Sequence, residues 1–212
     1  MKIFQTNAFQ ENIIYFITDL IASKALNFSQ LFPILEKYNL FGFFLEIEIS
    51  DSDLFFNLLE MIKEISVLPD SYDFLIKSGI ISKLFEAMQS SISFNAKKII
   101  IKCFSTILYY ASDEVINYFI ENNVMEYLKM SLDLVRSKKN LVHTLCSISN
   151  IVDALMKENR IDELEEIYND SDLYSRVEEI NDKYKDRSSE RTEEIRIESF
   201  SLYSKLREMN LE

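Results

Sequence analysis

One stretch of the sequence carries a histidine and a serine at the spacing of a nucleophilic pair. His143 and Ser147 are four residues apart, so on a helix their side chains share one face. A histidine activates a serine for catalysis only together with an orienting acid and an oxyanion hole. The chain has only two glycines, Gly42 and Gly79, and neither lies near this pair in the sequence to form such a hole. We therefore expect no enzyme activity and interpret His143 as a partly buried or groove-lining residue.

The sequence lacks the groups of residues that a metal site or a reactive thiol requires. His143 is the only histidine, which excludes a site built from several histidines. Cys103 and Cys146 have no further metal ligands beside them, so we interpret both as thiols of the core. The acidic run at residues 162–172 fits a helix followed by a turn, or a contact with a basic partner, rather than an EF-hand loop. The sequence predicts no cofactor and no metal ion.

Two groups of basic residues lie at the beginnings of long amphipathic segments. The groups are Lys97, Lys98 and Lys102, and Arg136, Lys138 and Lys139. Such side chains could bind an acidic peptide or a phosphate, and the alternative is that they are solvated surface residues. A surface that binds nucleic acid normally shows a broad basic stripe, which two separate groups do not form.

The composition narrows the fold to one class. Two glycines and two prolines in 212 residues leave few positions for tight turns. Folds rich in β-structure need glycine in such turns, and a phosphate-binding loop needs several glycines close together. With 48% hydrophobic and 27% charged residues, the chain has the composition of a folded globular protein. We therefore expect an all-α protein.

The net charge of −12 is unevenly distributed. Residues 151–212 hold 18 of the 35 acidic residues and 10 of the 23 basic ones, a net charge of −8. Such a surface repels the phosphates of nucleic acids and favours a basic or neutral face of another protein. The first residues lack the features of a signal peptide, and no apolar stretch reaches the roughly 18 residues of a membrane span. We expect a cytoplasmic or nuclear protein with reduced cysteines.

A pattern of about 40 residues recurs four times and supplies the elements that must position these side chains. Each copy is centred on a glycine or an asparagine, which we call the pivot; the pivots are Asn39, Gly79, Asn123 and Asn159. Apolar residues stand four positions before and five positions after each pivot. Glycine and asparagine adopt the left-handed conformation at the lowest cost, and that conformation ends helices. The pattern predicts a helix, a sharp elbow and a second helix in each copy.

Longer amphipathic segments follow the first three pivots, at residues 50–68, 93–112 and 137–157, and Ser52 and Ser93 are suitable N-cap residues for the first two. Two short helices and one long helix in every 40 residues are typical of a solenoid, because one such unit cannot bury its own core. Too few residues lie between the third long segment and the last pivot, Asn159, to form a separate helix. The first helix of the last unit must therefore merge with the long helix before it.

These features resemble the armadillo and HEAT-type helical repeat families, and the armadillo family more closely. Residues 76–88 are similar to the turn between the first two helices of an armadillo repeat, and residues 143–152 to the third helix of importin-alpha-type repeats. Asn150 falls on the asparagine position of that third helix, whereas Cys146 stands where the family has tryptophan. The resemblance covers residues 29–187. It implies a right-handed α-solenoid of about three three-helix repeats with degenerate terminal caps.

The expected organisation is a single armadillo-like domain over residues 1–212. Residues 1–28 form a leading partial repeat, residues 29–187 form the repeats, and residues 188–212 form a C-terminal helix. That helix caps the last unit, or it remains a mobile tail.

From the resemblance we expect a non-enzymatic scaffold or adaptor that holds a peptide or a helix of another protein in a concave groove. Third helices line such a groove, and Tyr109 with Tyr110 is the best candidate for an exposed aromatic pair. The groove candidates are Lys102, Tyr109, His143, Cys146, Ser147, Asn150 and Asp153. An importin-alpha-like cargo adaptor or a chaperone co-factor is the alternative, and an RNA-binding helical repeat is a second alternative.

Overall fold

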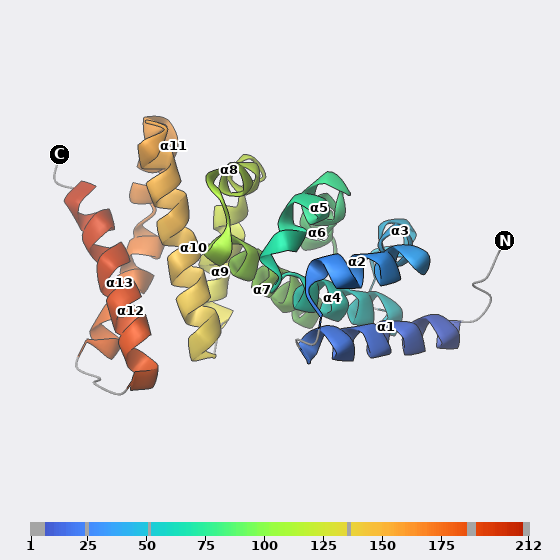
Figure 1. Ribbon diagram of the computed structural model, residues 1–212. Helices are drawn as coiled ribbons and strands as arrows, with labels where there is room; N and C mark the ends of the chain where they lie inside the picture. The colour runs from blue at the N-terminus through green and yellow to red at the C-terminus, as the bar shows by residue number, and fades with distance from the viewer. Residues whose placement is uncertain (1–6, 24–25, 51, 135–136, 186–189, 210–212) are drawn as a thin grey trace. The chain divides into compact units, whose positions relative to one another are not determined.

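The computed structural model describes residues 7–23, 26–50, 52–134, 137–185 and 190–209 (Figure 1). All regular secondary structure in these residues is helical, which confirms the expected all-α class. The chain divides into two compact units, residues 1–103 and 104–212, and the division falls within the long helix α7 (Phe94–Tyr110).

In its described residues, the first unit contains six helices before α7. They are α1 (Asn7–Ala22), α2 (Phe28–Lys37), α3 (Leu40–Glu46), α4 (Asp53–Ile65), α5 (Tyr72–Lys77) and α6 (Ile80–Gln89), with a 3-10 turn, η1 (Pro69–Ser71), before α5. Helix α1 packs along α4, and α6 packs against both α5 and α3. Residues 50–68 and 93–112 were expected to contain long helices, and α4 and α7 confirm both predictions.

The part of the second unit that the structure describes contains the end of α7 and six further helices. They are α8 (Asp113–Glu121), α9 (Val124–Leu134), α10 (Lys138–Lys157), α11 (Ile161–Tyr168), α12 (Ser171–Tyr184) and α13 (Glu190–Met209). Helix α10 contacts α8, α9 and α11 and packs along α13, which also packs along α12. Residues 190–209 therefore form a helix that packs against α10 and α12.

All four pivots lie at helix junctions in the left-handed conformation. Gly79 has a φ angle of 83°, and the φ angles of Asn39, Asn123 and Asn159 are 49°, 55° and 55°. Among the described residues no others have positive φ. Helix α10 runs unbroken to Lys157, just before the last pivot, so the predicted merging of two helices is also confirmed.

The apolar columns beside the pivots form the core of both units. Four positions before the pivots stand Leu35, Leu75, Phe119 and Leu155, and five positions after them stand Phe44, Leu84, Leu128 and Leu164, all of them buried. Two positions after the pivots, burial is incomplete, since Ile161 is 53% exposed. The last copy of the pattern therefore departs from the others at its second helix.

The beginnings of two long helices are capped as the sequence predicts. The Ser52 hydroxyl accepts a hydrogen bond from the Phe55 N–H at the start of α4, with a donor–acceptor distance of 3.2 Å. The Ser93 hydroxyl accepts one from the Ala96 N–H at the start of α7, at 3.3 Å. These bonds satisfy backbone donors that have no partner within the first turn of a helix.

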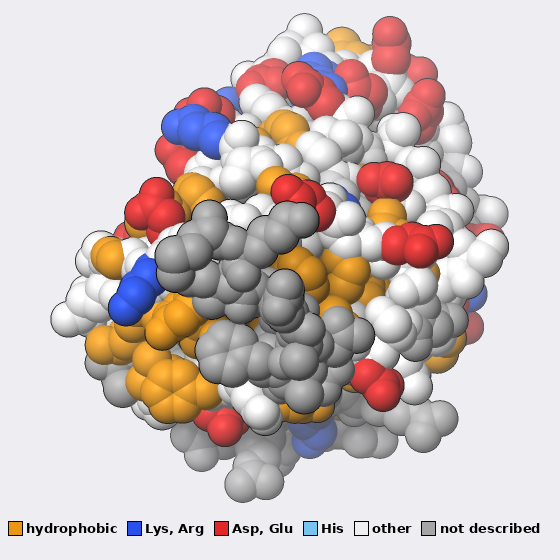
Figure 2. All heavy atoms as spheres, turned by 90° about the vertical axis from the view of Figure 1, so that its right-hand side faces the viewer, with side chains coloured by type: hydrophobic (Ala, Val, Ile, Leu, Met, Phe, Trp, Pro, Cys, Tyr) orange, Lys and Arg blue, Asp and Glu red, His pale blue; other side chains and the backbone are white. Residues whose placement is uncertain are grey.

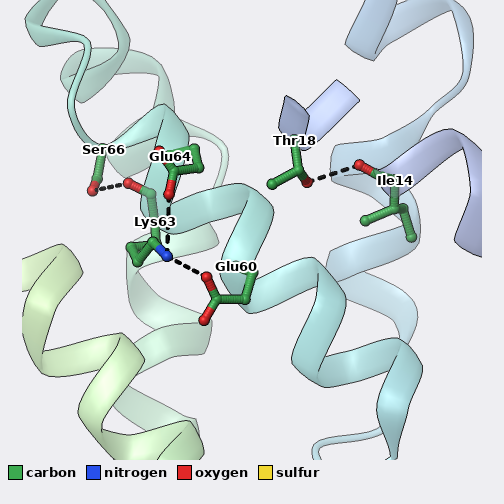
Figure 3. Close-up of polar contacts among 6 residues, drawn as sticks. All are labelled: Ile14, Thr18, Glu60, Lys63, Glu64 and Ser66. Atoms are coloured by element: carbon green, nitrogen blue, oxygen red, sulfur yellow. Dashed lines mark hydrogen bonds and ion pairs between the residues drawn. The ribbon is translucent and has the colours of Figure 1, made fainter. Parts of the chain in front are cut away.

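Polar side chains on α1 and α4 bond within their own helices (Figure 3). The Thr18 hydroxyl donates to the carbonyl of the preceding turn of α1, at 2.8 Å. At the end of α4 the Ser66 hydroxyl donates to the Lys63 carbonyl at 2.6 Å, and the Lys63 ammonium contacts Glu60 and Glu64. Because each bond closes within one helix, these groups leave the apolar faces of α1 and α4 free to pack together.

Apolar side chains also reach the surface of the first unit. Figure 2 shows several of them exposed beside acidic groups. On α1, Tyr15 and Phe16 are 55% and 65% exposed. No helix in the described part of the chain is both long enough and apolar enough to cross a bilayer.

Side-chain contacts within each unit recur at nearly constant sequence separations. In the first unit the Lys83 ammonium donates to the Leu45 carbonyl, 38 residues earlier. In the second unit, hydrogen bonds join residues 41 or 42 positions apart; the pairs are Asn117–Glu158, Lys129–Asp170, Ser105–Ser147 and Leu108–Asn150. These separations are close to the spacing of the pivots, which are 40, 44 and 36 residues apart.

Candidate functional site

Six of the seven predicted groove residues lie in the second unit, on the end of α7 and along α10. Tyr109 belongs to α7, and the other five belong to α10. Lys102 lies on α7 within the first unit and is half-buried. The α7 and α10 residues of the second unit are therefore the ones that the structure brings together.

Ser147 and Asn150 fasten α10 to the end of α7. Ser147 is fully buried, and its hydroxyl lies 2.9 Å from the Ser105 carbonyl and 2.6 Å from the His143 carbonyl. The Asn150 amide donates to the Leu108 carbonyl at 2.9 Å. Ser147 is thus a residue of the helix interface, and its prediction as a groove residue is wrong, because no part of its side chain reaches the surface.

A buried hydroxyl cluster extends this interface and was missed by sequence reasoning. The Thr144 hydroxyl is 2.8 Å from that of Ser131 on α9 and 3.4 Å from that of Ser105 on α7. It also donates to the Asn140 carbonyl at 3.0 Å. The sequence signal that could have revealed this cluster is the pair Ser105 and Thr144. Both are small hydroxyl residues in otherwise apolar segments, and they lie 39 residues apart, which is close to the repeat spacing.

Helix α13 covers part of the predicted groove face of α10. The Lys205 ammonium lies 2.7 Å from both carboxylate oxygens of Asp153 and 2.7 Å from the Ser149 hydroxyl. Burial, followed by the neighbouring Glu198 carboxylate, raises the pKa of the Cys146 thiol above its usual range. Cys146 and Asp153 therefore contact the chain's own C-terminal helix, which the sequence pattern did not reveal.

The aromatic rings of α7 and α10 form a cluster beside this interface. The Tyr109 ring stacks on the His143 imidazole with centroids 4.5 Å apart and planes inclined by 19°. Tyr110 stands edge-on to both rings, with centroids 4.5 Å from Tyr109 and 6.2 Å from His143. Tyr110 is 52% exposed, whereas His143 is only 8% exposed. The cluster thus presents an aromatic face to solvent and has a buried imidazole behind it.

A pocket of about 410 Å³ opens over this cluster. Its walls come from α7, α10 and α13, and it is lined by Tyr109, Tyr110, Lys138, Lys139, Val142, His143 and Glu194. Two lysines and one glutamate give the lining an excess of positive charge, although the whole chain is acidic. We call this site the aromatic pocket. Arg136, which the sequence grouped with these lysines, lies outside the described residues.

Two titratable groups of the aromatic pocket, His143 and Tyr109, are neutral near pH 7. Burial, with a smaller effect of the Lys139 ammonium, lowers the pKa of His143 to about 4. Burial raises the pKa of Tyr109, and Cys146 and Glu194 add to that rise. An uncharged imidazole and a protonated phenol make the wall of the pocket apolar over the ring faces and able to hydrogen-bond at the ring edges.

Neither cysteine has the environment of a reactive thiol. Cys103 is fully buried, and burial raises its pKa to about 12. Because the thiolate is the nucleophilic form, such a thiol is inert at neutral pH. Among the described residues, no three His, Cys, Asp or Glu side chains come together as a possible metal site.

No protein-family model and no curated protein sequence matches this chain.

Proposed function

We propose that the chain is a non-enzymatic scaffold of armadillo-like repeats that binds a peptide or a helix of another protein at the aromatic pocket. The observation that carries the proposal is the exposed aromatic face of Tyr110, backed by the stacked Tyr109 and His143 rings. Large rings held in place by neighbouring rings contribute much contact area at little entropic cost, which is why they dominate protein interfaces.

The repeat architecture is supported by two independent regularities. The pivots are all left-handed, and the contacts within each unit recur at separations close to the pivot spacing. Helical units that contact their equivalents one repeat later are the building principle of α-solenoids, whose long helices offer extended binding surfaces. A scaffold of this kind presents side chains from successive repeats to one partner.

A binding role also fits the arrangement of the histidine and the serine. The Ser147 hydroxyl contacts the backbone carbonyl of His143 rather than its imidazole. A nucleophilic pair needs the imidazole to take the hydroxyl proton, and Ser147 is buried away from any substrate. The net charge of −12 favours a partner whose surface outside the aromatic pocket contact is basic or neutral.

The experiment that tests this function compares two exposed tyrosines. Tyr110 is 52% exposed at the aromatic pocket, and Tyr15 is 55% exposed on α1 of the first unit. Wild type, Tyr110→Ala and Tyr15→Ala would each be used to capture partners from native lysate, with mass spectrometry as the readout. We expect a partner that is lost with Tyr110→Ala and kept with Tyr15→Ala. Equal capture by all three proteins would refute the aromatic pocket as the binding site.

A further inference from the structure

The aromatic pocket carries two lysines at the N-terminal end of α10, and only the Glu194 carboxylate in its lining offsets part of their charge. Lys138 and Lys139 are exposed in the first turn of α10, and no described residue forms an ion pair with either. That turn contains no acidic residue, and the Ser137 side chain makes no capping bond. The N-terminal end of a helix carries a partial positive charge, so two lysines there add to it instead of offsetting it. Electrostatically, this corner of the pocket favours an anion.

The imidazole of His143 is the second observation that points to a ligand. The residue is more than nine-tenths buried and lines the pocket, and no described residue makes a hydrogen bond to its ring. The ring therefore has hydrogen-bonding capacity that the described part of the protein does not use. An imidazole held between a tyrosine ring and a pocket is placed to hydrogen-bond with whatever occupies the pocket.

We propose that the aromatic pocket binds an acidic side chain of the partner peptide, with its carboxylate between Lys138 and Lys139 and its carbon stem against the Tyr110 ring. This inference rests on the proposed function, because it specifies the chemistry of the residue that enters the pocket. Glu194 also lines the site, so the lining carries a single excess positive charge. A carboxylate with one negative charge matches it better than a phosphate group with two.

A bound carboxylate would change the protonation of the buried imidazole. The titratable groups that face His143 are Tyr109 and Tyr110 from α7, Lys138 and Lys139 from α10, and Glu194 from α13. Burial and Lys139 together favour the neutral imidazole in the empty pocket. A nearby anion favours the charged imidazole, so we expect binding to raise the pKa of His143. Binding at acidic pH should therefore be accompanied by uptake of a proton.

The unique histidine provides a direct probe of this site. Since His143 is the only histidine in the chain, its carbon-bound ring protons give unambiguous NMR signals in the full-length protein. The probes are a capped five-residue peptide of alternating phenylalanine and glutamate, the same peptide with glutamine in place of glutamate, and inorganic phosphate. We expect the glutamate peptide to shift the histidine signals and to raise their titration midpoint by about one pH unit. The glutamine peptide should bind about five- to ten-fold more weakly.

A matched pair of charge variants completes the experiment. Lys138→Gln with Lys139→Gln should weaken the glutamate peptide about five- to ten-fold. Lys97→Gln with Lys98→Gln removes the same charge at the start of α7 in the first unit and should leave the affinity unchanged. Equal affinity for the two peptides would overturn the carboxylate but leave the proposed function standing. Tighter binding of phosphate would overturn the choice of a carboxylate, and histidine signals unmoved by either peptide would count against both proposals.

Discussion

Tyr109 and His143 stack face to face across the contact between α7 and α10, with 4.5 Å between their ring centroids. The stack closes one end of an interface that the Ser147 and Asn150 side chains continue with hydrogen bonds to α7 carbonyls. The same ring pair forms a wall of the aromatic pocket. Stability of the second unit and the proposed recognition therefore depend on one set of side chains.

The burial of His143 makes the stability of the protein depend on pH. Its pKa is about 4 in the folded protein and about 6.5 in an unfolded chain, so the unfolded state binds the proton more readily. Stability from this group is fully present above pH 6.5 and is lost as the pH falls towards 4. The loss should reach up to about 3 kcal/mol. Urea unfolding of wild type and His143→Gln from pH 7 to pH 4 measures it.

The carboxylates of the chain titrate in both proteins, so the difference between wild type and His143→Gln isolates the histidine. We expect the free energy of unfolding of the variant to fall less steeply over this range. Parallel curves would show that the imidazole titrates alike in the folded and unfolded states, and the buried position of His143 would then be wrong.

Substitutions at Gly79 should show that the elbow requires glycine because of its left-handed backbone conformation and not because a side chain lacks space there. A Cβ at Gly79 would meet nothing closer than the Leu45 side chain at 4.0 Å, so only the φ angle of 83° opposes substitution. Gly79→Ala should destabilise the protein by about 1–2 kcal/mol. Gly79→Asn should cost less, because the other pivots are asparagines at φ angles near 50°. Thermal unfolding checks both variants, and equal losses for Ala and Asn would argue against a left-handed elbow.

The elbows and the capped helix starts were predictable because their causes are local. Asn39, Gly79 and Ser52 act through the backbone within a few residues, and the apolar columns follow the helical period. Which face of a helix meets its neighbour depends on the packing of residues distant in sequence. Sequence reasoning therefore placed Ser147 in the groove, although its hydroxyl bonds to α7. It also did not foresee that Lys205 of α13 would pair with Asp153.

Asn150 should act as a structural residue. The Leu108 carbonyl that it binds lies in the last turn of α7, where carbonyls have no partner within the helix. Asn150→Ala should cost about 1–2 kcal/mol. Asn150→Asp should cost more, because a carboxylate cannot donate to the carbonyl and repels it. Urea unfolding measures both variants, with the exposed Asn95→Ala as the control, and no loss in either Asn150 variant would rule out this role.

The acidic surface of α11 is expected to steer the partner. Glu165 and Glu166 are exposed and have no ion pair among the described residues, whereas Glu163 is paired with Arg160. Exposed charges influence association rates more than dissociation rates. Glu165→Gln with Glu166→Gln should therefore slow association with the captured partner by about two- to five-fold at low salt, as measured by surface plasmon resonance.

The matched control for this pair is Glu46→Gln with Glu48→Gln, which removes the same charge from two exposed positions in the first unit. It should leave the association rate unchanged. If the two double variants associate at the same rate as wild type at low salt, the acidic residues of α11 serve only to keep the surface solvated.

The central claim is that the partner lies against the Tyr110 ring, and site-specific photocrosslinking tests it most directly. A photoreactive benzoylphenylalanine would replace Tyr110 in one protein and Tyr15 in another, two tyrosines of nearly equal exposure. On irradiation in native lysate, we predict that the protein labelled at Tyr110 forms a covalent adduct with one partner peptide segment and that the protein labelled at Tyr15 does not. Adducts of the same partner at both positions, or at Tyr15 alone, would contradict the account.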